Sequence, residues 1–215
     1  MSRRRADDEQ DTRTAILDAA ERLVQRRGFN GFSYADVAEE LRVTKAALHY
    51  HFPGKAELGE ALIIRYAERF VAALEQIDLR ETDAADKLRG YGDLYLEVLS
   101  QGRMCLCGML AAEYETLPDP MRETVVRFFD ANNNWLASLL ELGRAQGSLV
   151  FVGSSEEAAQ MIIGALEGAM LVARPYGSTA RFETAAARLI ADFSRPSPDG
   201  PVGLPRADPD SYQTV

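Results

Sequence analysis

Two short helical segments separated by a tight turn, within residues 32–58, constrain the fold of this chain more than any other stretch. Ser33 is a typical helix N-cap, and the apolar residues that follow it recur at helical spacing. Thr44 caps a second short helix, which the pair Pro53-Gly54 ends. Two short helices around such a turn form a helix-turn-helix pattern, which indicates a DNA-binding unit with its second helix in the major groove.

The same stretch resembles the DNA-binding unit of the TetR/AcrR family of bacterial transcriptional regulators. The resemblance rests on the run AALHYHF at residues 46–52 and on the helix that begins at Lys55. His49 stands where tyrosine is commonest in the family. The resemblance implies an all-α fold of about nine helices. A three-helix head at residues 11–54 would then sit on a larger ligand-binding and dimerisation body at residues 55–193.

The residue types of the predicted recognition helix suit contacts with DNA. We expect Lys45 and Tyr50 to contact bases, while the small side chain of Ala46 lets the backbone approach the groove. Side chains with hydroxyl, imidazole or ammonium groups are expected to bind phosphates: Ser33, Tyr34, Thr44, His49, His51 and Lys55. The two histidines are two positions apart, so on a helix they diverge by about 200° and cannot bind one metal ion.

The charge of the chain is divided unevenly along its length. Its net charge is −9, but residues 1–55 hold ten Lys/Arg against nine Asp/Glu, and residues 56–215 hold fourteen against twenty-four. The head is therefore the part that can face phosphate, and it is not strongly basic. We expect moderate non-specific affinity for DNA and a modest dependence on salt.

Both ends of the chain differ in composition from the rest. Residues 1–10 pass from a basic triplet to an acidic cluster without apolar periodicity, which predicts a disordered arm that could reach a minor groove. Residues 194–215 are rich in Pro, Asp and Gly, which predicts a disordered tail. The chain has neither an apolar run of 18 residues nor a secretory signal at its start, so we expect a cytoplasmic protein that associates with the nucleoid and not with a membrane.

The body is expected to consist of helices bounded by Gly, Pro and Ser, at residues 82–100, 104–116, 118–146, 155–174 and 179–193. Aromatic, methionine and polar side chains gather on three of them, which is the composition of an apolar ligand pocket between helices. The family resemblance implies an inducer pocket here, and the candidate lining residues are Tyr91, Tyr95, Val98, Cys105, Leu106, Met109, Glu113, Phe128, Phe129, Asn132 and Trp135.

The last two helices are the predicted dimer interface. The first of them is apolar around most of its circumference, so it must be covered on several sides. In the family these helices pair with their copies, and the residues expected at the interface are Ile162, Leu166, Ala169, Met170, Leu189 and Phe193. A two-fold dimer would place its two recognition helices about one DNA turn apart over a pseudo-palindromic operator.

Two cysteines, Cys105 and Cys107, raise an alternative mode of regulation. Family members that regulate N-ethylmaleimide reductase genes use a cysteine near this position to sense electrophiles. No Lys or His lies within one helical turn to lower a thiol pKa, which favours buried and unreactive thiols over a sensor. The cysteines are too few for a structural zinc site or a disulfide framework.

Other function classes are less consistent with the sequence. Outside the head no Ser or Cys nucleophile has a histidine partner, and the chain contains no Gly-rich phosphate loop or HExxH metal motif, so we expect neither an enzyme nor a cofactor. The sequence leaves one alternative open, which is a helical dimer that acts through a protein partner without binding DNA. The leading prediction is a repressor that a small apolar or amphipathic effector releases from operator DNA.

Overall fold

The computed structural model describes residues 2–194 of the chain, and this part is built of helices. The α-helices of the head are α1 (Ser2–Arg27), α2 (Tyr34–Leu41) and α3 (Lys45–His51). Those of the body are α4 (Lys55–Arg80), α5 (Ala84–Ser100), α6 (Leu106–Ala112), α7 (Asp119–Gln146), α8 (Ser155–Ala173) and α9 (Ala180–Phe193). Two 3-10 turns, η1 (Tyr114–Thr116) and η2 (Arg174–Tyr176), complete the described elements. The prediction of an all-α fold with a helix-turn-helix head on a helical body is confirmed.

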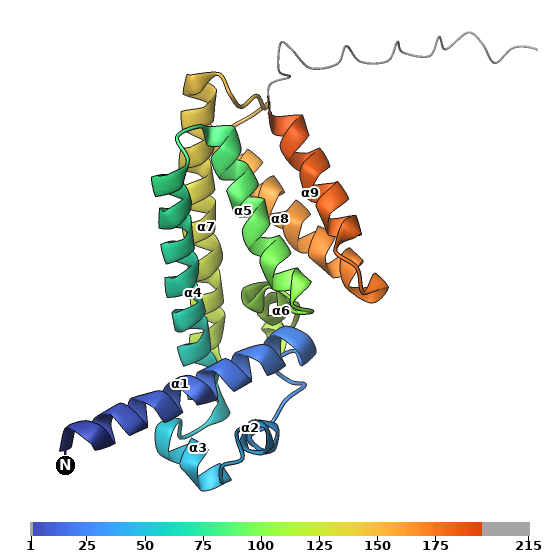
Figure 1. Cartoon of the computed structure of the whole chain (residues 1–215). Coiled ribbons are helices and arrows are strands. Elements are labelled where there is room, and N and C mark those ends of the chain that lie inside the picture. The colour runs from blue at the N-terminus through green and yellow to red at the C-terminus, as the bar shows by residue number, and fades with distance from the viewer. Residues whose placement is uncertain (1, 195–215) are drawn as a thin grey trace, which may run out of the picture.

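The head lies across one end of the body. Helix α1 crosses the ends of α4 and α7, and α2 and α3 lie on its far side (Figure 1). Helices α4, α5 and α7 stand side by side, and α8 and α9 form the opposite edge of the body (Figure 1). Helix α4 carries the chain from the head into the body, so a displacement of α4 moves both.

Local sequence explains the two short helices. The Asp36 carboxylate accepts hydrogen bonds from the backbone N–H and the hydroxyl of Ser33, at 2.7 and 2.6 Å, and so fixes the start of α2. Thr44 caps α3, where its hydroxyl accepts a hydrogen bond from the Ala47 N–H at 3.3 Å. Between them, Arg42 adopts the left-handed conformation with φ of 56°, which reverses the chain at the turn.

The two predicted disordered ends have different outcomes. Helix α1 begins at Ser2, so the arm predicted over residues 1–10 is, from Ser2 onward, a continuation of the first helix. Apolar residues recur at helical spacing only from about Ala15 onward. The sequence pattern therefore predicted too short a first helix, because the first turns of α1 have no apolar face. At the other end, Ser194 pairs with Leu149 in an isolated bridge, and the rest of the predicted tail, residues 195–215, lies outside the described residues.

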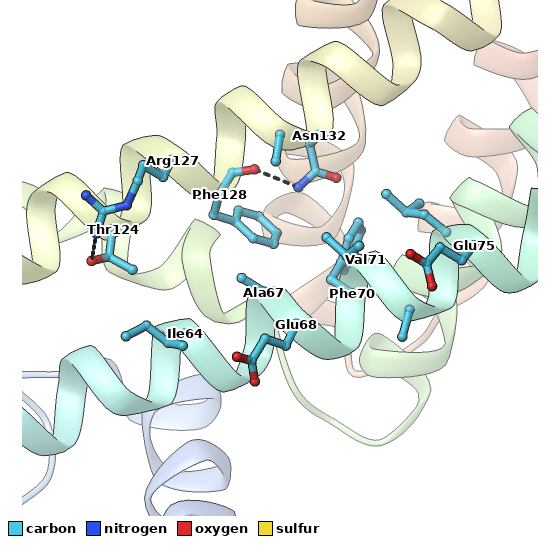
Figure 2. Close-up of a pocket in the computed structure, with 13 residues that line it drawn as sticks. Ile64, Ala67, Glu68, Phe70, Val71, Glu75, Thr124, Arg127, Phe128 and Asn132 are labelled. Carbon is cyan, nitrogen blue, oxygen red and sulfur yellow. Dashed lines mark hydrogen bonds between the residues drawn. The ribbon is translucent and has the colours of Figure 1, made fainter.

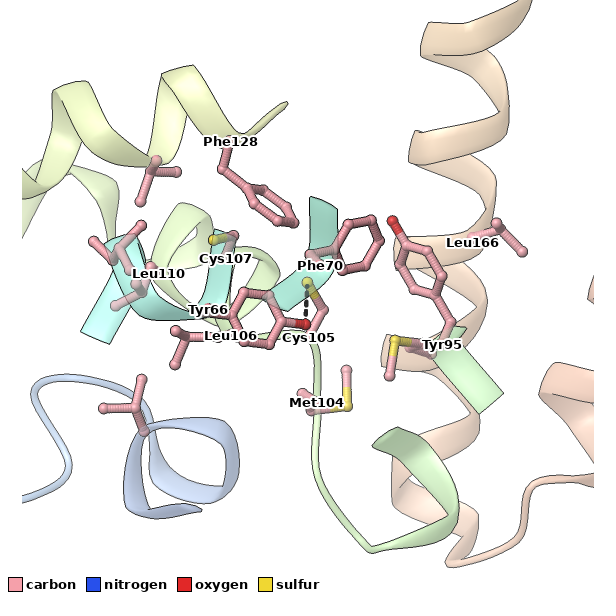
Figure 3. Close-up of a cluster of buried hydrophobic side chains, with 14 of the residues drawn as sticks. Tyr66, Phe70, Tyr95, Met104, Cys105, Leu106, Cys107, Leu110, Phe128 and Leu166 are labelled. Atoms are coloured by element: carbon pink, nitrogen blue, oxygen red, sulfur yellow. Dashed lines mark hydrogen bonds between the residues drawn. The ribbon is translucent and has the colours of Figure 1, made fainter. Parts of the chain in front are cut away.

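Aromatic and sulfur-containing side chains make up the centre of the body. Figure 3 shows Tyr66 and Phe70 from α4 facing Phe128 from α7 and Tyr95 from α5, with Cys105 among them. The Phe70 and Phe128 rings pack edge to face with their centroids 5.3 Å apart. This cluster joins α4, α5, α6 and α7 into one core. None of the described helices is long and apolar enough to cross a membrane.

Candidate DNA-binding head and effector groove

The recognition helix α3 presents an exposed surface made of small and polar side chains. Lys45 and Ala46 are exposed at its N-terminal end, and the Tyr50 side chain is 71% exposed one turn further on. The Tyr50 hydroxyl donates a hydrogen bond to the Glu9 carboxylate at 3.3 Å. Leu48 is fully buried and attaches the helix to the head. The residues predicted to contact bases therefore lie where a major groove can reach them.

Tyr34 and His49 contact the turn that follows α3. The Tyr34 hydroxyl donates to the carbonyls of Phe52 and Gly54, at 2.9 and 2.7 Å. Burial, with a smaller contribution from a nearby carboxylate, raises the pKa of Tyr34 to about 12. The His49 Nδ1 lies 3.0 Å from the Pro53 carbonyl oxygen, and its ring packs against that of Tyr34. Both side chains thus stabilise the turn after α3, and the exposed His49 ring keeps its predicted contact with phosphate as a prediction.

Lys55 also differs from its predicted role. Its ammonium donates to the Phe29 carbonyl at 2.6 Å and lies 4.5 and 4.4 Å from the ring centroids of Phe29 and Phe32. Burial lowers the pKa of Lys55, and the negative charge of Glu113 opposes this effect. The cation therefore faces the inside of the head. The Ser33 hydroxyl donates to Asp36, whereas Thr44, which caps α3, is exposed and His51 at its end is partly exposed.

Glu113 connects the body to the head. Its carboxylate accepts hydrogen bonds from the backbone N–H of Phe29, at 2.5 Å, and of Asn30, at 3.3 and 3.4 Å. The Asn30 side chain in turn donates to the Thr116 hydroxyl at 2.7 Å. Gly28 permits this approach, because a Cβ atom there would lie 2.6 Å from the Glu113 carboxylate. Glu113 was predicted to line the pocket, and its position beside the α1–α2 loop corrects that prediction.

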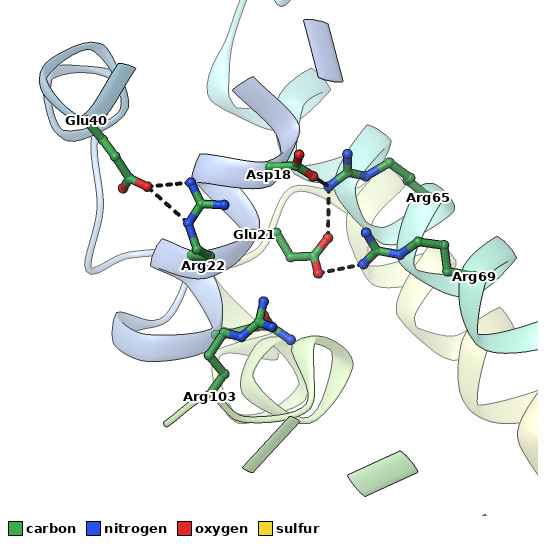
Figure 4. Close-up of polar contacts among 8 residues, drawn as sticks. Asp18, Glu21, Arg22, Glu40, Arg65, Arg69 and Arg103 are labelled. Atoms are coloured by element: carbon green, nitrogen blue, oxygen red, sulfur yellow. Dashed lines mark hydrogen bonds and ion pairs between the residues drawn. The ribbon is translucent and has the colours of Figure 1, made fainter. Parts of the chain in front are cut away.

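Helix α1 is attached to the body by further polar contacts. The buried Glu21 carboxylate receives Arg65 at 3.0 Å and Arg69 at 2.5 Å, both from α4 (Figure 4). The Met104 N–H donates to the Gln25 carbonyl at 3.2 Å, and Arg103 donates to the Gln25 side chain at the same distance. These contacts bring α4 and the segment before α6 to one face of α1. Because Glu21 is buried, loss of either arginine would leave its charge less compensated.

A cavity of about 470 Å³ opens between α4 and α7, and we call it the α4–α7 groove. Figure 2 shows side chains from both helices facing each other across it. The residues that line it are Ile64, Ala67, Glu68, Phe70, Val71, Ala72, Leu74, Glu75, Thr124, Arg127, Phe128, Ala131 and Asn132. Its floor is apolar and aromatic, and its size is that of a small-molecule site. Of the eleven residues predicted to line a pocket, only Phe128 and Asn132 belong to this groove.

The other predicted pocket residues pack mainly in the core. Tyr91 and Tyr95 are buried with their hydroxyls 3.0 Å apart, and the Tyr91 hydroxyl donates to Asn132 at 3.2 Å. The Trp135 indole stacks on Tyr91 and donates to Asp78 at 2.9 Å. The remaining residues are Leu106, which is buried, and Phe129 and Met109, which pack partly buried against the core. Val98 lines a separate cavity of about 340 Å³ between α1, α4 and α5.

Both cysteine thiols are buried, as the unreactive interpretation predicts. Burial raises the pKa of Cys105 and of Cys107, and the Glu167 carboxyl raises both further. The Tyr66 hydroxyl donates to the Cys105 sulfur at 3.6 Å. Cys105 precedes α6 and Cys107 lies within it. Among the described residues, the charged groups that act on the two thiols are carboxyls, which do not favour a thiolate.

Glu167 is a buried carboxyl that the sequence analysis did not connect to this site. Its Oε1 atom is buried without a hydrogen-bond partner among the described residues, and its other oxygen packs directly against Gly108 of α6. Burial raises its pKa to about 7, and a hydrogen bond with Cys105 partly offsets this effect. The Glu167 carboxyl on α8, which lies beside Gly108 of α6, therefore has a pKa near neutral pH. No group of three or more His, Cys, Asp or Glu in the described part of the chain could hold a metal ion.

Comparison with known proteins is consistent with this geometry. The profile described as "Bacterial regulatory proteins, tetR family" matches residues 16–62, and that described as "Tetracyclin repressor-like, C-terminal domain" matches residues 84–189. The chain belongs to the TetR family of bacterial regulators. Members of this family among the matched relatives include proteins named as transcriptional repressors and regulators.

Individual relatives of this TetR-family protein match nearly their whole length. A TetR-family transcriptional regulator from Agrobacterium tumefaciens superposes with a TM-score of 0.84 at 30% identity, covering 87% of this chain and 100% of that one. The HTH-type transcriptional repressor NemR of Escherichia coli K12 is 29% identical over 196 residues, 88% of this chain and 97% of the relative. The reduced form of Escherichia coli NemR superposes with a TM-score of 0.76 at 28% identity, covering 87% and 99% of the two chains.

The dimer interface predicted for this TetR-family chain requires a correction of helix phase. The predicted residues Ile162, Leu166, Met170 and Phe193 are each at most 3% exposed within the single chain, while Ala169 and Leu189 are partly buried. The four buried residues pack against the chain's own helices, whereas Ala169 and Leu189 keep part of their surface for a partner. The exposed face of α8 carries small and apolar side chains instead: Met161, Gly164, Ala165, Gly168, Leu171 and Val172.

Proposed function

We propose that this TetR-family regulator is a repressor that a small apolar or amphipathic effector, bound in the α4–α7 groove, releases from a pseudo-palindromic operator. The observation that carries this proposal is the path of α4. One side of that helix lines the groove, and its first residue, Lys55, binds the Phe29 carbonyl inside the head. A molecule that separates α4 from α7 must therefore displace the head or strain that contact.

On the DNA side, Lys45 and Tyr50 supply the side chains for base contacts. Lys45 can donate to guanine O6 or N7, and the Tyr50 hydroxyl can donate or accept once it leaves Glu9. Ala46 leaves space for the groove edge, and Thr44 and His51 lie at the surface to reach phosphates. Few cations are involved, which is consistent with modest salt dependence.

Signal transmission from the body uses two attachments of the head. The first is α4 itself, through Lys55 and the ion pairs of Arg65 and Arg69 with Glu21. The second is Glu113, which follows α6 and holds the α1–α2 loop. Because the head is bound at both points, a change in spacing between α4 and the rest of the body reorients α3 relative to the body. Only one head orientation fits both half-sites of an operator.

The proposed dimer forms through the exposed face of α8. At Gly164 and Gly168 an added Cβ atom would meet nothing within 4 Å, so two copies of this helix could approach closely there. Met161 and Leu171 are 54% and 60% exposed, an apolar surface that a second copy would cover. A two-fold dimer of this kind places one head on each side of its axis.

A gel-shift experiment at several salt concentrations tests the proposal. The probes are the DNA upstream of the chain's own gene and a random duplex of equal length. We expect a specific complex on the upstream DNA that survives excess random duplex. If neither duplex shifted at low salt, DNA binding would be rejected, and the alternative of a helical dimer acting through a protein partner would take its place.

A further inference from the structure

Charge and shape in the α4–α7 groove indicate the class of its effector. We infer that the groove takes an elongated apolar molecule that carries a positively charged nitrogen, such as a hydrophobic quaternary ammonium. This inference rests on the proposed function, because it assigns the ligand class of the same groove. Two carboxylates and one arginine surround the apolar floor of the groove.

The floor of the groove can bind the apolar part of such a molecule. Phe70 and Phe128 form its centre, and Ile64 and Val71 of α4 are each 44% exposed beside them (Figure 2). Exposed aliphatic side chains next to buried aromatic rings form a surface that a ligand stabilises by displacing water. The groove runs between α4 and α7, which form its two walls, and this shape suits an elongated ligand.

The negative charges in the groove are uncompensated. Glu68 and Glu75 both line it, and they are seven residues apart on α4, about 10 Å along the helix axis. Neither carboxylate has a recorded ion pair or hydrogen bond with another described residue. A cationic group placed beside either carboxylate would therefore be attracted without displacing an existing partner.

The one cation that lines the groove is already engaged. Arg127 donates to the Thr124 hydroxyl at 2.7 Å, and its guanidinium lies 3.7 Å from the Glu123 carboxylate. An anionic ligand would have to compete for this arginine while lying near two free carboxylates. The net charge of −9 adds to that repulsion. The charges that line the groove therefore select against anions and for cations.

Three probes with one apolar body and different head groups test the inference: phenylbutyltrimethylammonium, phenylbutanol and phenylbutanesulfonate. Binding is followed by the fluorescence of Trp135, the only tryptophan, which lies one turn beyond Asn132 on α7. We expect the ammonium compound to bind at least about tenfold more tightly than the alcohol, and the sulfonate to bind most weakly. Equal affinities for the three probes would overturn the inference.

Variants that remove the carboxylate charges test whether Glu68 and Glu75 cause the preference for the ammonium compound. The double variant Glu68→Gln, Glu75→Gln should weaken ammonium binding about three- to tenfold and leave phenylbutanol binding unchanged. Glu60→Gln removes one carboxylate charge from α4 outside the groove, and it serves as the control for each glutamate of the pair replaced singly. If the double variant lost the alcohol as much as the ammonium, or if Glu60→Gln had the same effect, the assignment to these carboxylates would be wrong.

Each protein is also tested for operator binding without any probe. A protein that binds DNA but does not prefer the ammonium refutes the ligand class and leaves the repressor proposal intact. A protein that fails to bind DNA refutes the repressor proposal, whatever its preference among the probes. The two failures are therefore distinguishable.

Discussion

The Glu113 carboxylate accepts the backbone N–H of Phe29 at 2.5 Å, although the two residues are 84 positions apart in the sequence. Phe29 belongs to the loop between α1 and α2, and Glu113 ends α6 in the body. One acceptor from the body thus satisfies backbone donors of the head. We therefore expect a movement of α6 to reach the loop that precedes the helix-turn-helix.

Replacing Glu113 by alanine should weaken the coupling between effector and DNA. The Phe29 and Asn30 N–H groups would lose their acceptor, which costs about 1–3 kcal/mol where they stay away from water. We expect a lower melting temperature and a smaller effect of bound probe on operator affinity, with probe affinity itself unchanged. Glu115→Ala, an exposed neighbour in η1, is the control. An unchanged coupling in Glu113→Ala would contradict the role assigned to this carboxylate.

Substitution of Lys45 should lower DNA affinity, whereas substitution of Lys55 should lower stability. Lys45→Ala removes an exposed cation from α3 and is expected to reduce specific DNA affinity by about 1–3 kcal/mol if it reads a base. Lys55→Met removes a cation that faces Phe29 and Phe32, so it should lower stability and leave the salt dependence of DNA binding unchanged. Gel shifts over a salt series, with thermal melts of both variants, measure the difference. A reduced salt slope in Lys55→Met would place that cation on the DNA.

The helices were predictable from the sequence because their signals are local. Caps such as Thr44, the stop at Pro53-Gly54 and apolar spacing depend on neighbours within one or two turns, and the predicted body helices agree closely with those observed. The recognition helix α3 could be identified from the sequence for the same reason. Helix α1 was predicted too short, since its first turns carry no hydrophobic period.

The direction of individual side chains was not predictable, because it depends on distant contacts. Helix α8 is apolar nearly all round, so spacing alone could not tell whether Ile162 or Met161 faces the core. Lys55 follows the recognition helix in sequence, yet its ammonium points to Phe29, which only the packed head brings near. Glu113 looked like a polar group in an apolar pocket. Its partners are in another domain, and no local signal marks them.

A charge on the exposed face of α8 should prevent dimer formation. Gly168→Glu places a carboxylate where a second copy is proposed to approach, and in a two-fold dimer it would meet its own copy. Light scattering during size-exclusion chromatography should then report a monomer, and operator affinity should fall steeply. Thr184→Glu, on the exposed side of α9, introduces the same charge elsewhere on the surface. A dimer that persisted in Gly168→Glu would place the interface on a different face.

The two thiols should react slowly in the folded protein. Cys105 and Cys107 are buried, and burial raises the pKa of each, so little thiolate is present at neutral pH. We expect labelling by a disulfide reagent to be at least about a hundredfold slower than in denatured protein, and mild alkylation to leave operator binding intact. Rapid release of DNA on alkylation, abolished in the double Cys→Ser variant, would instead establish the electrophile-sensing alternative.

The carboxyl of Glu167 should make stability fall as the pH rises toward neutrality. Its pKa is about 7 in the folded protein and near 4.5 without the surrounding structure, so between these values the folded state retains a proton that the unfolded chain has released. The free energy of unfolding therefore decreases from about pH 4.5 to about pH 7 and then levels, with a full effect on the order of 3 kcal/mol.

The variant Glu167→Gln separates this carboxyl from other titrating groups. Asp36, Asp78 and Glu156 have lowered pKa values, so the stability that they add is lost only as the pH falls below about 4, outside this window. We expect Glu167→Gln to flatten the decline between pH 5 and pH 7.5 and to melt at a higher temperature than the parent at pH 7.5. Because Glu167 packs on Gly108 of α6, the same variant should also weaken any pH dependence of operator release. If both proteins lost stability equally across this range, the buried proton would have to reside on another group.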